Sequence, residues 1–232
     1  MREFARNKVP LIALVGWCVG MLVVRMVYSR SVVNTFLLWN LVLAVVPVVA
    51  SSLMALVDRR RGAVALKTVC FIVWLVFLPN APYLVTDFVH LTHYPPVPLW
   101  YDVALFGSFA ATGALLGYAS VAEIESLLRA RFGSAWALAV SVASLLLCGF
   151  GIYLGRFLRF NSWDVLADPR TLGHQVVHEV VHPVSHPASW EVPAVYGFGL
   201  VLGYLALRSV APLLTPAIQA DSRPRSNSLP RR

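Results

Sequence analysis

The sequence predicts an all-α integral membrane protein, a polytopic bundle of about six transmembrane helices. Of its 232 residues, 58% are hydrophobic and only 13% are charged, and the mean hydropathy is +0.70. Soluble domains carry about 25% charged residues, so a chain this apolar is not expected to fold in water. Lys and Arg (19) outnumber Asp and Glu (11), but they are scattered between apolar runs. This scatter argues against a nucleic-acid partner and instead reports orientation in a membrane.

Six apolar runs are long enough to cross the hydrocarbon core, which takes about 20 helical residues. The predicted spans are Val9–Tyr28, Val32–Val57, Ala63–Leu78, Trp100–Ala122, Ala135–Leu158 and Val192–Leu214. The third is short, and Lys67 inside it would have to extend to the nearer interface. The charged N-terminus resembles a secretory signal, but no small-residue cleavage site follows, so we interpret it as a retained signal anchor.

The positions of Lys and Arg orient the predicted bundle. One side carries Arg2, Arg6, Lys8, Arg59, Arg60, Arg61, Lys67, Arg129, Arg131, Arg208, Arg223, Arg225, Arg231 and Arg232, and the other carries Arg25, Arg30, Arg156, Arg159 and Arg170. By the positive-inside rule, the first side and both termini lie in the cytoplasm. We expect one transmembrane domain over 1–219 and a basic cytoplasmic tail over 220–232, which is too polar to pack and is predicted to be disordered.

On this topology, titratable side chains gather on the outer side. All six histidines lie there, together with Asp87, Asp102, Asp164, Asp168, Glu179 and Glu191. The three cysteines, Cys18, Cys70 and Cys148, lie inside apolar runs without a CxxC spacing or a nearby His. They predict neither a disulfide framework nor a metal site, and we expect no cofactor.

The first polar stretch, FLPNAPYLVTDFVHL (77–91), follows the third span. Pro79 and Pro82 should end that helix, and Asn80 would satisfy the carbonyl groups that they leave open. A helix stop at the interface is one sufficient explanation of these residues.

Beyond Pro82, helical spacing returns. Tyr83, Asp87, His90 and Tyr94 share one face, which predicts a short amphipathic helix in the outer interface or a re-entrant segment. The wet face of an interfacial helix more often carries Lys or Arg. The Asp87–His90 pair is therefore a candidate for acid–base or metal chemistry.

The second polar stretch, GIYLGRFLRFNSWD (151–164), ends the fifth span. Arg156 and Arg159 lie three residues apart, at an end where the positive-inside rule disfavours arginine, so we expect anionic partners. Two explanations stay open: structural ion pairs, or an anionic ligand held by the guanidinium groups. The candidate acidic partners are Asp87, Asp102 and Asp164.

Asp102 opens the fourth span, where a carboxylate also favours the helix N-terminus. Two small-residue patterns, Gly113-x3-Gly117 and Gly151-x3-Gly155, predict close packing of the fourth and fifth spans. That packing would bring Asp102 near Arg156.

A histidine-rich run, HQVVHEVVHPVSH (174–186), contains the HExxH residues His178, Glu179 and His182. On a helix, this spacing presents two imidazoles to a zinc ion and a carboxylate to its water. Pro183 follows directly and no clear third ligand comes after it, so we favour an interfacial helix with its valines toward the lipid. A zinc hydrolase is the alternative.

Both polar stretches resemble a known set of bacterial membrane proteins. The similar residues are Leu78-Pro79-Asn80-Ala81-Pro82-Tyr83, Thr86-Asp87-Phe88-Val89-His90-Leu91, Asp102, Gly155-Arg156-Phe157-Leu158-Arg159 and Asn161-Ser162-Trp163-Asp164. The family is domain of unknown function 1361, and the resemblance covers about residues 30–212. It implies a multi-pass protein of the bacterial inner membrane with no established activity. HExxH is not part of the family's signature.

The leading hypothesis is a polar binding or catalytic site at the outer face, acting on an anionic lipid or envelope precursor. Asp87 and His90 would orient the ligand or move protons. The ligand-binding residues would be Asn80, Tyr83, Asp102, Arg156, Arg159, Asn161, Trp163 and Asp164. Membrane lipids are the expected partners. A non-catalytic envelope scaffold, in which these groups form structural ion pairs, is the alternative. Whether the protein is an enzyme is left open.

Overall fold

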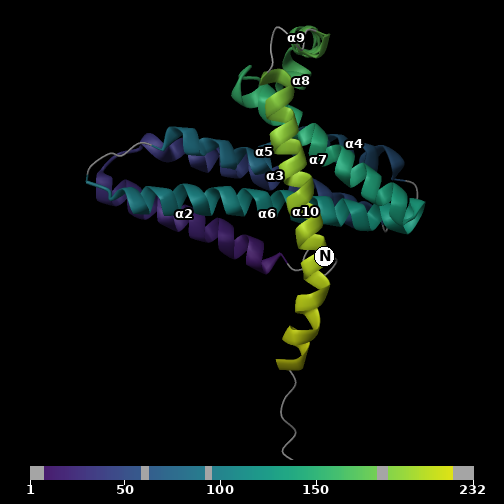
Figure 1. The fold of residues 1–232 in the computed structure, drawn as a ribbon, viewed down its shortest axis with the longest axis horizontal. Helices are drawn as coiled ribbons and strands as arrows, with labels where there is room; N and C mark the ends of the chain where they lie inside the picture. Colours follow the sequence, from purple (N-terminus) through teal and green to yellow (C-terminus); the bar gives the residue numbers. More distant parts are fainter. Residues whose placement is uncertain (1–7, 59–62, 92–95, 182–187, 222–232) are drawn as a thin grey trace, which may run out of the picture.

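The computed structural model describes residues 8–58, 63–91, 96–181 and 188–221, and this part of the chain is helical without strands (Figure 1). Its α-helices are α2 (Val9–Ser29), α3 (Phe36–Asp58), α4 (Val64–Phe77), α5 (Asn80–Tyr83), α6 (Leu99–Phe132), α7 (Ser134–Arg156), α8 (Asp164–Ala167), α9 (Pro169–Val181) and α10 (Ala188–Asp221). Two 3₁₀ segments, η1 (Val33–Thr35) and η2 (Leu84–His90), complete them.

Six helical stretches in the described part are long and apolar enough to cross a membrane. They are Val9–Ser29, Val33–Asp58, Val64–His90, Leu99–Phe132, Ser134–Arg156 and Ser189–Val210. The prediction of an all-α polytopic membrane protein is confirmed. The exterior agrees with it, because large apolar side chains such as Trp136 (70% exposed) and Phe198 (61%) cover the bundle. In a bilayer these side chains contact hydrocarbon instead of water.

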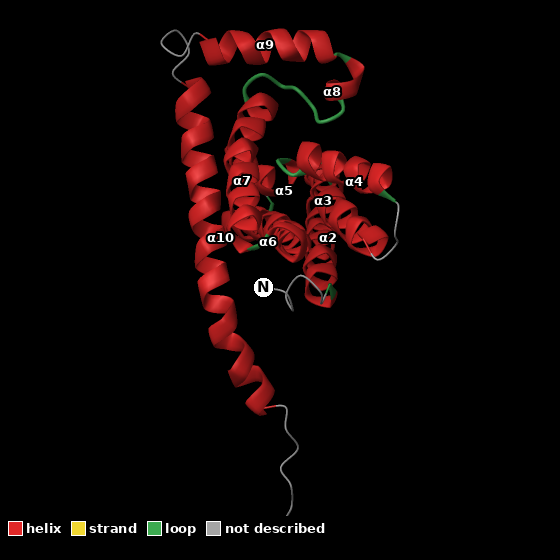
Figure 2. Ribbon diagram, turned by 90° about the vertical axis from the view of Figure 1, so that its right-hand side faces the viewer, coloured by secondary structure: helices red, strands yellow, loops and turns green. Residues whose placement is uncertain are grey.

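The long helices are arranged around α6. α2, α3 and α6 share one direction, seen lengthwise in Figure 1 and end-on in Figure 2. α10 packs on α7 and crosses that direction steeply, and α9 lies across the end of both (Figure 2). One apolar cluster joins α2, α3 and α6 around Leu37, Leu41 and Phe109, and a second joins α4, α6, α7 and α10 around Trp74 and Tyr204.

The third span differs from its prediction. α4 ends at Phe77, but helical turns continue through α5 and η2, so that the span reaches His90. Pro79 is the N-cap of α5 and Pro82 lies in its first turn, where backbone N–H groups have no intrahelical partner to lose. As predicted, the Asn80 amide satisfies an open carbonyl, donating to that of Phe77 at 3.0 Å.

The segment from Asn80 to His90 buries most of its polar face, although His90 at its end is exposed. Ala81 and Leu84 are fully buried and Asp87 is 1% exposed, because the segment packs between α3 and α6. The expected wet-faced interfacial helix is therefore wrong, and Asp87 points into the protein. Tyr94 lies outside the described residues.

The fourth span is also longer than predicted. α6 runs from Leu99 to Phe132, and 34 helical residues extend about 51 Å, well beyond the roughly 30 Å of hydrocarbon. Its last turns carry Glu123, Glu125 and Arg129, whose charges are satisfied by ion pairs described below. At the chain's other end, α10 continues to Asp221, and the rest of the predicted tail lies outside the described part.

Candidate functional site

A buried carboxylate and a partly buried guanidinium meet where α3, η2 and α7 converge. Asp87 Oδ2 accepts a hydrogen bond of 2.9 Å from the side-chain amide of Asn40. Asp87 Oδ1 lies 3.8 Å from Nη1 of Arg156. Nη2 of Arg156 donates to the Thr86 carbonyl at 3.1 Å, and its guanidinium carbon lies 5.9 Å from the centre of the Tyr83 ring. Two of the predicted groups, one acidic and one basic, are thus brought together.

Four glycines make this convergence possible. A Cβ atom added at Gly113 would lie under 3.0 Å from the Ala81 carbonyl oxygen, and one added at Gly151 would lie under 3.0 Å from the Pro79 ring. The Cβ contact at Gly155 would be 3.1 Å, to the Tyr83 ring, and that at Gly117 would be 3.3 Å, to the Ala81 side chain. We expected both glycine patterns to pack α6 on α7. α6 and α7 do contact each other, as predicted, but the glycines serve another contact: each pattern accommodates the segment around α5.

Asp87 and Arg156 line a cavity of about 540 Å³, here called the charged cavity. Its other lining residues are Val33, Asn34, Phe36, Asn40, Tyr83, Val89 and His90. Asp87 and His90 lie three residues apart on a 3₁₀ segment, a spacing that places their side chains on the same face. The His90 ring contacts Phe36 edge-on, with ring centroids 5.2 Å apart.

The second polar stretch folds back over α5. Asn80 donates to the Ser162 hydroxyl at 2.7 Å, and the Trp163 ring contacts the Trp39 ring edge-on at 6.3 Å. Beneath this loop lies a second cavity of about 170 Å³, here called the apolar cavity. Its lining residues are Trp39, Asn40, Leu43, Val76, Pro79, Asn80, Tyr83, Gly151, Leu154, Gly155, Phe160, Asn161, Ser162, Val165 and Leu172.

Three predicted ligand residues of this stretch have different surroundings. Asp164 accepts a hydrogen bond of 2.6 Å from the Asn161 backbone N–H, so this carboxylate closes its own loop. Arg159 is exposed at a left-handed backbone position (φ 60°) and pairs with none of the described carboxylates. Neither Arg159 nor Asp164 lines the charged cavity, whereas Asn161 lines the apolar one.

Asp102 pairs with Arg25, which was not among the predicted site residues. Its Oδ1 accepts from Nε of Arg25 at 2.6 Å and its Oδ2 accepts from Nη2 at 3.3 Å. These side chains are 1% and 2% exposed, and neither residue lines either cavity. The expected approach of Asp102 to Arg156 is therefore replaced by a closed pair between α2 and α6. Arg25 was recognisable as a charge inside a span, which calls for a partner.

The HExxH carboxylate faces into the protein. Glu179 is 3% exposed and accepts hydrogen bonds from the Tyr153 hydroxyl at 3.0 Å and from Gln175 at 3.1 Å. The bond from Tyr153 attaches α9 to α7. His182 lies outside the described residues. Within the described part, no group of three His, Cys, Asp or Glu side chains is placed to hold a metal ion.

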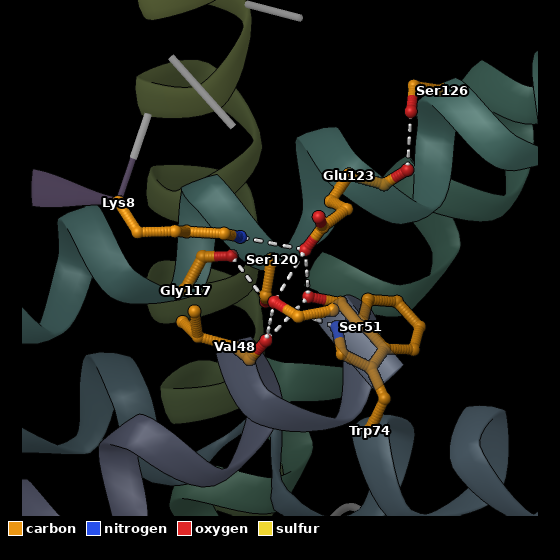
Figure 3. A network of polar contacts seen from close by, with 9 residues as sticks. Lys8, Val48, Ser51, Trp74, Gly117, Ser120, Glu123 and Ser126 are labelled. Carbon is orange, nitrogen blue, oxygen red and sulfur yellow. Dashed lines mark hydrogen bonds and ion pairs between the residues drawn. The ribbon is translucent and has the colours of Figure 1, made fainter. Parts of the chain in front are cut away.

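A second polar network lies near the C-terminal end of α6, and Figure 3 shows its part around Glu123. Glu123 accepts from Lys8 at 2.8 Å, Ser51 at 2.6 Å and Ser52 at 3.2 Å. Glu125, two residues on, accepts from Tyr204 and pairs with both Arg129 and Arg208. No role was predicted for these carboxylates from the sequence, although two acids near the end of an apolar helix were a signal for such a network.

The chain matches a known protein family over most of its length. The model of the family described as "Protein of unknown function (DUF1361)" matches residues 39–204, more than half of the sequence. The chain belongs to the DUF1361 family. The resemblance predicted from the two polar stretches is confirmed. No curated protein and no solved structure matches the chain.

The DUF1361 match separates the two Arg–Asp pairs. Asn40, Asp87 and Arg156 all fall inside the matched residues, as do the four glycines around α5. Arg25, which pairs with Asp102, falls outside the match. The charged cavity is thus built mainly from the DUF1361 region.

Proposed function

We propose that this protein binds an anionic group in the charged cavity, at the extracytoplasmic face of a bacterial inner membrane. The group is the headgroup of an anionic lipid or of an envelope precursor. One observation carries the proposal: Arg156 and Asp87 line a cavity together while their nearest charged atoms stay 3.8 Å apart. That distance exceeds a hydrogen bond, so guanidinium N–H groups remain available to a ligand.

The surroundings support a preorganised anion site. Arg156 is held from two sides, by the Thr86 carbonyl and by the Tyr83 ring, and its side chain remains 17% exposed. Guanidinium groups bind carboxylate and phosphate in a bidentate manner, through two parallel N–H···O hydrogen bonds. The hydrogen bond from Asn40 fixes the position of the Asp87 carboxylate, so Asp87 does not have to pair closely with Arg156.

Asp87 and His90 supply the remaining polar chemistry. Both line the charged cavity on the side of η2. A carboxylate and an imidazole on one face are suited to orienting a hydroxyl group of the ligand or transferring its proton. If the protein is an enzyme, these two are its catalytic residues.

The excess of Lys and Arg at the other end of the predicted bundle supports the orientation in this proposal. Both termini then lie in the cytoplasm. Membrane lipids are the partners, and the charged cavity lies at the outer end, level with lipid headgroups.

A second function, a non-catalytic envelope scaffold, is favoured by a different observation. Asp87 is 1% exposed and hydrogen-bonded to Asn40, as a structural group would be. On this alternative, Asp87 and Arg156 serve only to fix η2 against α3 and α7.

Lipid analysis of purified variants separates the two functions. Wild type, Asp87→Asn and Arg156→Lys are purified in detergent, and the bound lipids are identified by native mass spectrometry. The binding function predicts normal yield for all three and loss of the bound anionic lipid from Arg156→Lys. Reduced yield for both variants, with unchanged lipid in the protein that remains, would favour the scaffold.

A further inference from the structure

The charged and apolar cavities have a wall in common. Asn40 and Tyr83 line both of them. On one side of this wall are the charged groups, Asp87 and Arg156, and on the other a pocket lined mainly by hydrocarbon. The apolar side chains of that pocket include Leu43, Val76, Leu154, Phe160, Val165 and Leu172.

The two amide side chains of Asn40 and Asn80, which line the apolar cavity, are already engaged within the protein. The Asn80 amide donates to both the Phe77 carbonyl and the Ser162 hydroxyl, at 3.0 and 2.7 Å. The Asn40 amide donates to Asp87. These groups therefore offer few free donors to a ligand, and apolar contact dominates what this cavity can recognise.

The rim of the apolar cavity carries large apolar side chains on the outer surface of the protein. Trp39, on the membrane-spanning helix α3, lines the cavity and is 55% exposed, and Val165 on α8 is 39% exposed. The rings of Trp39 and Trp163 meet edge-on beside it. Tryptophans are enriched at the level of lipid headgroups, where one end of the side chain is apolar and the other wet. A lipid chain in the outer leaflet can thus reach the cavity from the side.

We infer that the ligand is a single amphiphile that occupies both cavities. Its anionic headgroup lies against Arg156 in the charged cavity, and part of an apolar chain passes Asn40 and Tyr83 into the apolar cavity. This inference rests on the proposed anion-binding function and adds the class of ligand: an anionic lipid recognised by headgroup and chain together, instead of a free phosphate or carboxylate.

Chain length is the variable that tests the inference on the unaltered protein. The full chain in detergent is titrated with phosphatidylglycerol bearing long or short acyl chains, with inorganic phosphate, and with long-chain phosphatidylcholine, and binding is read by native mass spectrometry. Long-chain phosphatidylglycerol should bind at least about tenfold tighter than the short-chain form. Even a single methylene group in an apolar pocket changes affinity by about tenfold or more. Phosphate should bind more weakly than either.

Filling the apolar cavity should remove this advantage. Leu43→Trp places a larger side chain in the cavity. Its matched control is Val42→Trp, because Val42 is 51% exposed on the same helix. Leu43→Trp should bind long and short chains equally and keep its preference for the anionic headgroup, whereas the control should behave as wild type. Val76→Phe, from α4, is a second filling variant should Leu43→Trp not fold.

The outcomes distinguish the two proposals. Equal affinity for long and short chains in wild type, affinity for phosphate equal to that for the lipid, or an unchanged chain-length advantage in the filling variants would overturn the amphiphile inference and leave the anion site standing. No preference for phosphatidylglycerol over phosphatidylcholine, together with no effect of Arg156→Gln, would overturn the anion site itself.

Discussion

Arg25 and Asp102 form a closed pair, in which two nitrogens of one guanidinium approach the two oxygens of one carboxylate at 2.6 and 3.3 Å. Arg156 and Asp87 consist of the same two residue types, yet their nearest charged atoms stay 3.8 Å apart beside a cavity. The closed pair is suited to fastening α2 to α6. The open pair is suited to binding a polar or charged ligand group between or beside the Arg156 guanidinium and the Asp87 carboxylate.

Asp102→Asn should lower stability far more than Asp87→Asn. It leaves Arg25 buried without a counter-charge, which costs about 3–5 kcal/mol for a fully desolvated pair. In Asp87→Asn, Arg156 keeps the Thr86 carbonyl and the Tyr83 ring, so the loss should be smaller. Thermal unfolding in detergent measures both. The double variant Arg25→Met with Asp102→Leu should recover most of the stability, and its failure to do so would contradict a purely structural role for the pair.

Gly113→Ala should destabilise the bundle by about 1–3 kcal/mol, as overpacking of a tight contact does. The added methyl group would lie under 3.0 Å from the Ala81 carbonyl oxygen, and a backbone atom cannot move aside cheaply. Gly16→Ala is the control, because nothing lies within 4 Å of its Cβ position. That change should be neutral or stabilising, since alanine favours helices over glycine by roughly 0.5–1 kcal/mol. Equal melting temperatures for the two variants would contradict the close packing of α5 on α6.

Tyr204→Phe should loosen α10. Its hydroxyl donates to Glu125 at 2.6 Å, and both residues are almost fully buried, so its removal should cost about 1–3 kcal/mol. Tyr118→Phe is a matched control, because the Tyr118 ring packs beside that of Tyr204 while no hydrogen bond of its hydroxyl is found in the described part. Limited proteolysis and thermal unfolding provide the readout. A Tyr118→Phe protein as unstable as Tyr204→Phe would assign the effect to packing instead.

Single cysteines test the orientation. Arg159 and Arg131 are exposed at opposite ends of the bundle, and the native Cys18, Cys70 and Cys148 are buried. In a background in which these three are replaced, Arg159→Cys should react with a membrane-impermeant thiol reagent added to intact cells. Arg131→Cys should react only after the cells are opened. The reverse pattern would place the charged cavity on the cytoplasmic side.

The predicted fold class held because it rests on composition and run length. A chain with few charges and six apolar runs must satisfy its backbone hydrogen bonds internally, and helices do so within one segment. The third α-helix ends at Phe77, as Pro79 and Pro82 predict, but the span was predicted too short because helical turns continue beyond these prolines. In the structure, both occupy positions where a missing N–H is harmless, and turns continue to His90.

The residues by themselves thus determined that the chain crosses a membrane, which stretches are polar and which family it belongs to. Only the tertiary structure decided which charges pair: Asp102 with Arg25, and Asp87 with Asn40 and Arg156. Run length and composition act along the chain and can be read from it. Pairing depends on which helices lie side by side. For Asp87 and Arg156, that depends on glycines of α6 and α7 admitting the segment around α5, a contact between residues far apart in sequence.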